Sequence, residues 1–264
     1  MSGLWEYYKI RFLNLNFSQI LLIIICIIIA LILIFGLPRK KNLRIPSIEG
    51  IDNHEVAAAF EKMTNFLPFK LLRRKVLSQL NLYNPNGKFI DVGCGSGNLI
   101  VQIAKNFQDL NLIGVDISTE ILELAKKRVF ENDLKEKIDF KLGNVENLPF
   151  SDNSIDFLVS TLSLHHWQDP IRAFNEFFRV LKDDGTLLIF DFRRDARKFF
   201  YGLLKFATKI VVPKALKRIN EPLGSLQAGY TPKEIKQMVS QSPFNKVEIE
   251  PFLAWIFIEM KKFG

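Results

Sequence analysis

The decapeptide FIDVGCGSGN at residues 89–98 constrains the fold more than any other part of the chain. An apolar run stops at an acid, Asp91, and glycines then follow at every second position, Gly93, Gly95 and Gly97. Glycine adopts backbone conformations that other residues avoid, and it lets a ligand approach the main chain closely. In open α/β sheets, ligands bind beyond the carboxyl ends of the strands. We therefore expect this stretch to hold the end of a strand, a tight turn and the start of a helix.

Strand-like and helix-like segments alternate along the rest of the chain. Apolar runs predict strands at 88–92, 111–116, 137–143, 154–161 and 185–192, with two consecutive strands at 246–252 and 253–261. Amphipathic patterns predict helices at 98–107, 119–132 and 169–182, another one capped by Thr231, and two between 54 and 81 separated by Pro68. The alternation predicts a Rossmann-like α/β fold with a mostly parallel sheet and an antiparallel edge hairpin.

The segment before this domain is strongly apolar. Residues 20–37, ILLIIICIIIALILIFGL, would extend ~27 Å as a helix, close to the ~30 Å hydrocarbon core of a bilayer. A cleaved signal peptide is the alternative, but this run is longer than a typical signal core and is followed by PRKK rather than by a small-residue cleavage site. We expect a tail at 1–17, a retained transmembrane anchor at 18–37, a linker at 38–50 and the main domain at 51–264.

Flanking charges and cysteine usage both favour a cytoplasmic location for the main domain. Two basic residues precede the apolar run, and four follow it closely, which predicts that the C-terminal side faces the cytoplasm. The two cysteines, Cys26 and Cys94, have neither metal-ligand spacing nor the pattern of a disulfide framework. No metal site is expected, and the cysteine usage fits a reducing compartment.

Positive charge is concentrated in one segment. The chain has a net charge of +8, and residues 193–218 contain nine basic residues and one acid. Because aromatic and aliphatic residues are interleaved with these charges at 196–219, two interpretations stay open: a membrane-surface helix and a solvated charged face. No recognisable RNA-binding module accompanies the charge, so no nucleic-acid partner is expected.

The glycine spacing helps to define the ligand. The dinucleotide fingerprint is G-x-G-x-x-G, whereas this chain has G-x-G-x-G, with Asn98 where the third glycine of the fingerprint would be. Asp91 adds negative charge beside the turn, which suits a cationic group better than a pyrophosphate. Asp116 ends the next strand, where an acid is placed to accept the two ribose hydroxyls. A nucleoside with a positively charged tail, such as S-adenosylmethionine, fits this combination.

At this point the chain resembles the class I S-adenosylmethionine-dependent methyltransferases, closest to the group that includes quinone-biosynthesis C-methyltransferases. The resemblance covers about residues 60–192 and rests on these stretches: FIDVGCGSGN, GVDIS, GNVENLPF, SIDFLVSTLSLHHWQDP and FFRVLKDDGTLLIFDFRRD. It implies a seven-stranded sheet and one bound S-adenosylmethionine. Segments after the fifth strand often cap the acceptor site in this family, so the resemblance also implies a third interpretation of the basic segment, an amphipathic cap at about 193–230. It also implies a set of cofactor-binding residues, which are Asp91, Gly93, Cys94, Gly95, Gly97, Asp116, Ile117, Asn144 and Val145.

One of these residues departs from the family pattern. The family usually has an aspartate at the position of Asn144, where it accepts a hydrogen bond from the adenine amino group. The side-chain carbonyl of an asparagine can accept the same bond without the assistance of a charge. We expect cofactor binding to survive this change, with Val145 supplying the neighbouring backbone amide.

The catalytic residues are less closely defined. His165 and His166 follow the fourth strand, at the edge where the reactive methyl group is expected. Either could be a general base if the acceptor must lose a proton, or both could be structural, since alignment alone accelerates a displacement. Asp191 and Arg193 could line the acceptor pocket or form a structural pair. Cys94 is expected to be a small turn residue rather than a nucleophile.

The sequence thus predicts a membrane-anchored, cytoplasm-facing methyltransferase (EC 2.1.1.-) that acts on a small or lipid-like acceptor. Two other functions remain open at this stage. One is methylation of protein or RNA, and the other is a tethered adapter that binds S-adenosylmethionine without turnover.

Overall fold

The strands of the computed structural model, which describes residues 17–47 and 54–263, form one seven-stranded sheet in the order β3-β2-β1-β4-β5-β7-β6. The strands are β1 (Gly87–Val92), β2 (Leu110–Asp116), β3 (Ile138–Leu142), β4 (Ile155–Thr161), β5 (Leu181–Phe192), β6 (Lys246–Pro251) and β7 (Trp255–Lys261). The first five pair in parallel, and β7 runs antiparallel between β5 and β6. The predicted mostly parallel sheet with an antiparallel edge hairpin is confirmed.

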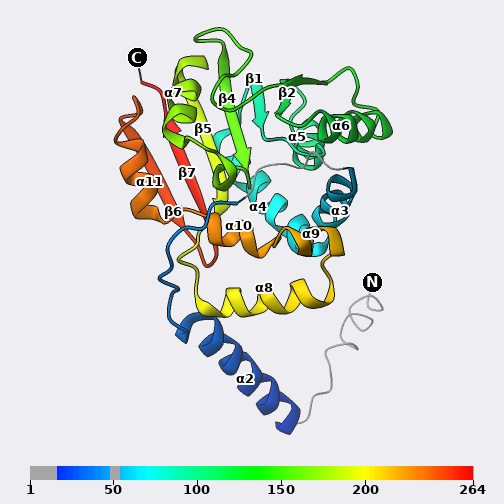
Figure 1. Cartoon of the computed structure of the whole chain (residues 1–264), viewed down its shortest axis with the longest axis vertical. Helices are drawn as coiled ribbons and strands as arrows, with labels where there is room; N and C mark the ends of the chain where they lie inside the picture. Colours follow the sequence, from blue (N-terminus) through cyan, green and yellow to red (C-terminus); the bar gives the residue numbers. More distant parts are fainter. Residues whose placement is uncertain (1–16, 48–53, 264) are drawn as a thin grey trace, which may run out of the picture.

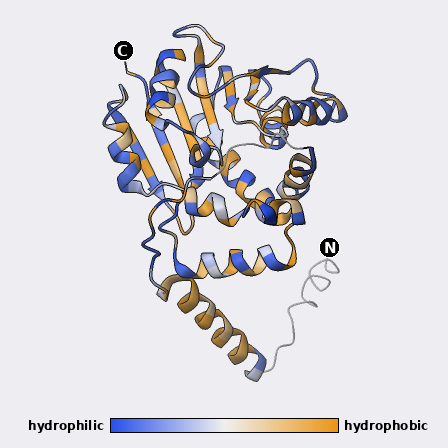
Figure 2. Cartoon of the chain, in the orientation of Figure 1, coloured by the Kyte–Doolittle hydropathy of each residue, from blue (hydrophilic) through white to orange (hydrophobic). Residues whose placement is uncertain are grey.

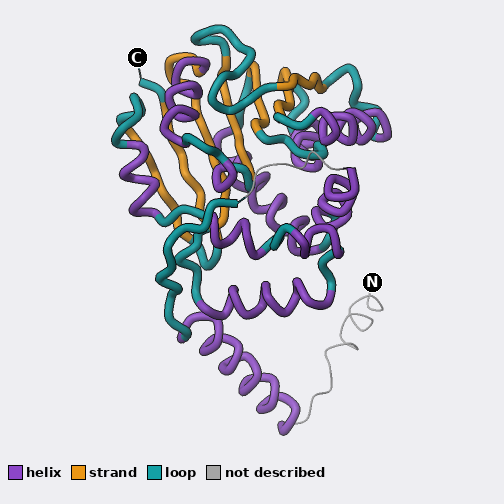
Figure 3. Tube along the Cα trace, in the orientation of Figure 1, coloured by secondary structure: helices purple, strands orange, loops and turns teal. Residues whose placement is uncertain are grey.

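Helices cover both faces of this sheet (Figure 1, Figure 3). One face packs on α4 (Leu67–Tyr83), α5 (Asn98–Asn106) and α6 (Thr119–Glu131), and the other on α7 (Pro170–Val180) and α11 (Pro232–Val239). Alternate side chains of a strand point to opposite faces, so in β1 Phe89 joins the first cluster and Ile90 the second. The apolar strands are therefore buried on both sides, as parallel strands usually are.

Two predicted boundaries were wrong. Pro68 lies in the first turn of α4 rather than between the two N-terminal helices, because a proline lacks only a backbone N–H that the first turn leaves unpaired. The helix predicted at 169–182 ends at Val180, and Leu181 already pairs with Ile155 of β4. The predicted cap of the last helix is confirmed, since Thr231 and Glu234 form a reciprocal capping box.

Short helices gather at the carboxyl end of the parallel strands. The region between β5 and α11 forms α8 (Lys198–Ile210), α9 (Lys214–Arg218) and α10 (Leu223–Ala228). Helix α3 (His54–Thr64) contacts α9, so a segment from before the sheet meets one from after β5 (Figure 1). These helices cover the sheet edge at which the glycine turn, Asp116 and the paired histidines lie.

The predicted anchor is a continuous helical segment made of α2 (Phe17–Leu31) and one π-helical turn, η1 (Ile32–Gly36). Among the described residues it is the one helix long and apolar enough to cross a membrane, with a mean hydropathy of 3.3 over Ser18–Gly36 and none of that window buried. Figure 2 shows it as an almost uniformly hydrophobic rod that extends away from the domain. The predicted tail, up to residue 16, lies outside the described residues.

The predicted linker is held against the domain over residues 38–47, a segment that we call the strap. The Lys40 amide donates to the Ala196 carbonyl at 3.0 Å, and the Ile45 amide donates to the Gln227 carbonyl at 3.3 Å. Arg44 donates to the Ala228 and His165 carbonyls at 2.7 and 2.9 Å. The strap thus runs as an ordered segment from the end of the anchor to the edge of the domain. Residues 48–50 of the predicted linker lie outside the described residues.

Gly97 offers a test of the turn that places α5. It caps α5 with φ at +76°, and a Cβ there would lie 3.2 Å from the Cβ of Ala125 in α6. Because a side chain is strained in this left-handed conformation by about 1–2 kcal/mol, Gly97→Ala should lower the melting temperature by roughly 2–8 °C. Thermal unfolding of the detergent-solubilised chain, followed by circular dichroism, measures the effect.

Gly202→Ala is the matched control. Gly202 lies in the interior of α8, and a Cβ there would meet no described atom within 4 Å. In a helix interior alanine is favoured over glycine by about 0.5–1 kcal/mol, so this variant should melt slightly higher. Equal shifts in the two variants would contradict a special role for the Gly97 conformation.

Candidate functional site

The glycine turn is fixed by hydrogen bonds from its backbone amides to the end of β2. The amides of Gly93 and Cys94 donate to the Val115 carbonyl at 2.8 and 3.0 Å, and the Gly95 amide donates to the carboxylate of Asp116 at 2.9 Å. A Cβ on Gly93 would lie 2.5 Å from the hydroxyl oxygen of Ser163, so only glycine fits between the two loops. The turn therefore approaches the loop after β4 along its bare backbone.

Asp116 lies at the end of β2, as predicted, and its carboxylate is fixed from two sides. Besides the Gly95 amide, it accepts the amide of Ser118 at 3.1 Å. Burial raises its pKa, and the amides of Ser118, Gly95 and Ile117 oppose that rise. Each carboxylate oxygen has more than one acceptor site, so Asp116 keeps capacity for further donors on the cavity side.

Asp91 lies behind the turn rather than in the cavity lining. Its side chain is fully buried in β1, and among the described residues neither carboxylate oxygen has a hydrogen-bond partner. Burial, and secondarily the charge of Asp116, raises the pKa of Asp91 to about 7. A buried carboxylate without partners is costly, so the site holds a proton or a negative charge that a nearby cation would stabilise.

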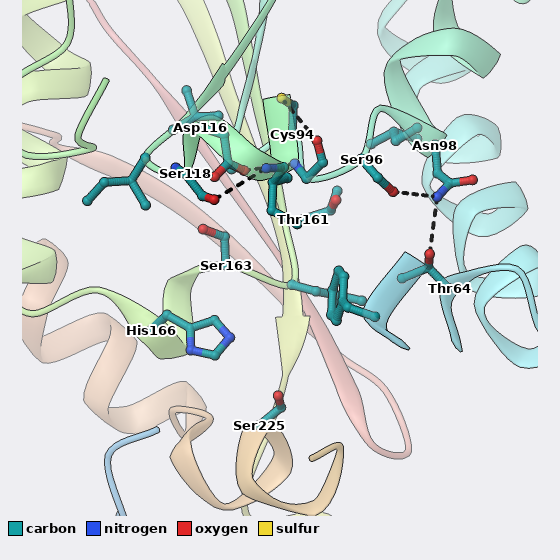
Figure 4. Close-up of a pocket in the computed structure, with 18 of the residues that line it drawn as sticks. Thr64, Cys94, Ser96, Asn98, Asp116, Ser118, Thr161, Ser163, His166 and Ser225 are labelled. Atoms are coloured by element: carbon teal, nitrogen blue, oxygen red, sulfur yellow. Dashed lines mark hydrogen bonds between the residues drawn. The ribbon is translucent and has the colours of Figure 1, made fainter. Parts of the chain in front are cut away.

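A cavity of about 220 Å³ opens in front of the turn (Figure 4). One part of its wall is polar and contains the turn, Asp116, Ile117, Asn144 and Val145. The rest of the wall is mainly apolar and is formed by Val56, Phe60, Phe69, Leu72, Leu216 and Ile219. Figure 4 shows Asp116 and Ser118 on one side of the cavity, with His166 and Ser225 facing it from the other side. The arrangement suits a polar nucleoside next to an apolar second molecule.

All but two of the cofactor-binding residues predicted from the resemblance line the cavity. Gly97 caps α5 and is not part of the cavity wall, and Asp91 is shielded by the turn. Cys94 lines the cavity but is buried, and burial, followed by the charges of Asp116 and Asp91, raises the pKa of its thiol. A protonated thiol is a poor nucleophile, in agreement with its predicted role as a turn residue.

Asn144 lies at the polar wall, with its side-chain carbonyl already accepting the Glu146 amide at 2.9 Å. A carbonyl oxygen has two lone pairs, so it can accept a second donor from the cavity. Val145 follows it along the same wall. The segment therefore keeps a hydrogen-bond acceptor at the position where the family usually has a carboxylate.

The two histidines have different environments. His165 is buried, and its Nδ1 lies 2.6 Å from Asp191, whose carboxylate also accepts the His165 amide at 3.0 Å. His166 lines the cavity, and its ring centroid lies 4.0 Å from that of His165. Burial, and then the neighbouring His165 and Arg44, lowers the pKa of His166 to about 3. The imidazole that faces the cavity is therefore neutral.

Asp191 and Arg193 take neither of the two roles left open for them, a lining of the acceptor pocket or a structural pair. Asp191 turns inward to His165, and Arg193 forms two 2.7 Å hydrogen bonds with Asp195. Neither residue is part of the cavity wall. Two residues that are two positions apart in a strand share a face, which would bring Asp191 and Arg193 together. Arg193, however, lies beyond the end of β5, where the backbone turns and Asp195 is the nearer acid.

Sequence reasoning missed Arg73 of α4. Arg73 lines the cavity, donates to the Thr64 carbonyl at 2.7 Å, and has a buried Nε without an acceptor in the described part of the chain. Burial, and then the nearby Arg128, lowers its pKa. Thr64 in turn accepts the side chain of Asn98, so Arg73 lies beside the end of the glycine turn. Its position next to Leu72 and Val76 in an amphipathic helix was the available signal.

Glu221 and Ser225 were also missed. Both are buried side chains at the apolar wall, and the Ser225 hydroxyl donates to the Glu221 carboxylate. Glu221 also accepts the hydroxyl of Ser47 at 3.3 Å, which connects the strap to the cavity. No group of His, Cys, Asp or Glu side chains within residues 17–47 and 54–263 could hold a metal ion.

A glycine turn after the first strand, an acid at the end of the second and a β7 inserted antiparallel next to β5 define a Rossmann-like nucleoside-binding fold of the methyltransferase type. Residues 90–189 match the methyltransferase domain family. The chain is 30% identical over 163 residues to the ubiquinone/menaquinone biosynthesis C-methyltransferase UbiE of Rickettsia felis, covering 60% of this chain and 66% of that enzyme. The corresponding enzyme of Rickettsia bellii is 28% identical over 218 residues, covering 80% and 86%.

A solved structure supports the same fold. A putative S-adenosyl-L-methionine-dependent methyltransferase from Methanococcus maripaludis superimposes with a TM-score of 0.65 and 20% identity, covering 83% of this chain and 98% of that one. The chain belongs to the class I S-adenosylmethionine-dependent methyltransferases.

Asp91 should lower the free energy of unfolding at high pH. The folded protein holds its proton up to a pKa of about 7, whereas the ordinary carboxyl releases it near 3.8. Between these values the folded state binds more protons, so this contribution to the free energy of unfolding falls as the pH rises from about 4 to 7. At pH 8 the free energy of unfolding of Asp91→Asn should exceed that of the natural protein by up to ~4 kcal/mol, and the variant should melt higher. At pH 4 the two proteins should melt at about the same temperature.

Asp139→Asn, at an exposed position of β3, is the control for loss of one carboxylate. Differential scanning fluorimetry of the ligand-free protein at several pH values reads out both variants. A difference between Asp91→Asn and the natural protein that stays constant from pH 4 to pH 8 would argue against a buried, unpartnered carboxyl.

Proposed function

We propose that this protein transfers a methyl group from S-adenosylmethionine to a small apolar, lipid-like acceptor at the cytoplasmic face of a membrane. The observation that carries the proposal is the division of the cavity. Its lining combines the polar groups of the glycine turn and Asp116 with a mainly apolar set of side chains, and His166 also lines it. A methyl donor and an apolar acceptor can be aligned in such a space, and alignment supplies much of the acceleration of a displacement reaction.

The residues fit a nucleoside whose tail carries both signs of charge. Asp116 would accept the ribose hydroxyls, Asn144 would accept the adenine amino group, and Val145 would present its backbone amide. Arg73, with its free Nε, would hold the carboxylate of the methionine end. Asp91, behind the turn, would stabilise the positive charge of the ammonium and sulfonium groups. When bound, S-adenosylmethionine supplies an electrophilic methyl group.

His166 is the residue that we assign to proton transfer from the acceptor. Its neutral imidazole is the form that accepts a proton, and the low pKa caused by burial keeps it in that form. Negative charge that develops on an acceptor would offset the burial and favour the protonated ring. His165, held by Asp191, would position His166 through the contact between the two rings.

The acceptor class follows from the apolar wall and the anchor together. Leu216, Ile219, Phe60 and Phe69 offer contact area for a ring or an acyl chain. The Rickettsia relatives are C-methyltransferases of ubiquinone/menaquinone biosynthesis, which makes a quinone-type acceptor the first compound to try. A single-pass anchor at 18–37, with the domain on the cytoplasmic side, would keep the enzyme next to such compounds, and the basic segment 193–218 would add a second contact.

Cofactor binding is the first prediction. Calorimetric titration of the detergent-solubilised full chain should show binding of S-adenosylmethionine that weakens by roughly 30- to 1,000-fold in Asp116→Ala, which loses two charge-assisted hydrogen bonds. Arg73→Gln should weaken binding by roughly 10- to 100-fold, while the adjacent, exposed Arg74→Gln leaves it unchanged. Affinity should also fall as the pH drops below about 7, by up to tenfold per pH unit, because protonated Asp91 loses its charge. No binding to the folded protein would remove the proposed function.

Turnover is the second prediction. With labelled S-adenosylmethionine and membrane lipid extract, label should pass into the organic phase, and His166→Ala should lower kcat by roughly 10²–10⁴-fold with cofactor affinity unchanged. His54→Ala, an exposed histidine of α3, is the matched control and should keep full activity. Label recovered in protein or RNA would point to a macromolecular acceptor. Cofactor binding without label transfer to any fraction would point to a tethered adapter.

A further inference from the structure

Helix α8 carries an apolar stripe on its outer face. Leu203, Phe206 and Ile210 are 52%, 63% and 66% exposed. Their spacing of i, i+3 and i+7 places them on one side of the helix. Large exposed apolar side chains scattered singly are ordinary, but a contiguous stripe marks an interaction surface. We call these three residues the α8 stripe.

The stripe is not the packing face of α8. Its opposite side carries Tyr201 and Leu204, which pack with Leu223 and Leu226 of α10, and the Tyr201 hydroxyl donates to the Arg194 carbonyl at 2.7 Å. Helix α8 is therefore fixed to the domain through its inner face. The described residues leave the outer stripe exposed.

Lysines border the stripe along one side. Lys198, Lys205 and Lys209 recur at i, i+7 and i+11, about a third of a turn from the apolar residues, and all three are exposed. No acid occurs within α8. A helix with apolar residues on one side and lysines next to them is typical of helices that lie in the interface of an anionic bilayer.

The start of α8 is bonded to the end of the anchor. The Lys198 amide donates to the Pro38 carbonyl at 3.0 Å, and Arg197 donates to the Leu37 carbonyl at 2.9 Å. Figure 1 shows α8 at the end of the domain from which α2 extends. If α2 and η1 cross a bilayer, Leu37 and Pro38 lie at its surface, and the first turn of α8 lies there with them.

We propose that α8 is an interfacial helix, with the α8 stripe inserted among the acyl chains of an anionic leaflet and the bordering lysines at the headgroups. The proposal rests on the proposed membrane anchor. The lysine border and the bonds to the anchor favour a bilayer over a second copy of the chain, whose matching lysines would repel them. Residues Leu216 and Ile219 of the cavity wall follow α8 closely. An apolar acceptor could therefore pass from the leaflet to the cavity without crossing water.

The depth of α8 can be measured in the full chain. A nitroxide would be placed at position 206 by Phe206→Cys in a Cys26→Ala background, where the other cysteine, Cys94, is buried and has a raised thiol pKa. In nanodiscs of phosphatidylcholine with phosphatidylserine, the label should be more accessible to oxygen than to a water-soluble nickel complex. The control label, from Lys127→Cys on exposed α6, should show the reverse order. Discs without phosphatidylserine should reduce the depth at position 206.

Three outcomes decide the proposal. Lipid-like accessibility at position 206 supports it. Water-like accessibility equal to that of position 127 overturns it. Protection from both reagents, with magnetic broadening between labels of two chains, overturns it in favour of a dimer. Retention of the chain in membranes after alkaline carbonate tests the anchor, and turnover with detergent-dispersed acceptor tests the enzyme. A failure of the anchor or of the enzyme is thereby distinguished from a failure of the proposal for α8.

A second set of variants connects the surface to catalysis. Leu203→Ser, Phe206→Ser and Ile210→Ser combined should lower turnover of an acceptor embedded in the bilayer and leave turnover of the detergent-dispersed acceptor unchanged. The matched control removes equally exposed apolar residues elsewhere, by Leu82→Ser, Phe130→Ser and Leu142→Ser combined. Equal losses in both sets, or none in either, would contradict a role of α8 in acceptor delivery.

Discussion

The hydrogen bond from the Gly95 amide to the Asp116 carboxylate joins the two parts of the chain on which the site depends. It is 2.9 Å long and connects the turn after β1 with the end of β2. Parallel strands end at the same edge of a sheet, and this bond, together with those from the Gly93 and Cys94 amides to the Val115 carbonyl, fixes how far the turn stands from the neighbouring strand. The Ser118 amide donates to the same carboxylate at 3.1 Å, and Gly93 lets the turn approach Ser163 in the loop after β4. A site built in this way is rigid on its polar side before any ligand arrives.

Two buried acids close to this bond set the electrostatics of the cavity. Asp91 has no hydrogen-bond partner in the described chain, and Asp116 has backbone amides that satisfy only part of its capacity. Burial raises the pKa of both, which shows that the folded protein pays for these charges in the absence of a cation. A positively charged ligand would reverse the effect, because it would stabilise the same carboxylates. The lower stability of the ligand-free protein and a preference for a cationic nucleoside would then have the same cause.

Much of the fold could be predicted from the sequence, because apolar periodicity and turn residues act over short distances. The strands up to β5, the edge hairpin and the capping box at Thr231 depend on neighbours within a few residues. Contacts between distant segments could not be predicted in this way. Arg73 faces the cavity because α4 packs on α5, and Asp191 turns to His165 because β5 lies beside β4. The adjacent charges of Asp191 and Arg193 suggested a pair, whereas three-dimensional proximity gave each a different partner.

The strap changes what the anchor can do. A flexible linker would let the domain move freely above a membrane, but residues 38–47 are bonded to Ala196, Gln227 and Ala228, so the end of the anchor is fixed relative to α8 and α10. Its far end reaches the cavity wall through the bond from Ser47 to Glu221. With the anchor in a bilayer and α8 at its surface, the height and tilt of the cavity would be determined by two attachments rather than one. A single anchor would leave rotation about its own axis free, and a second contact at α8 would remove that freedom and hold the apolar part of the cavity wall toward the leaflet.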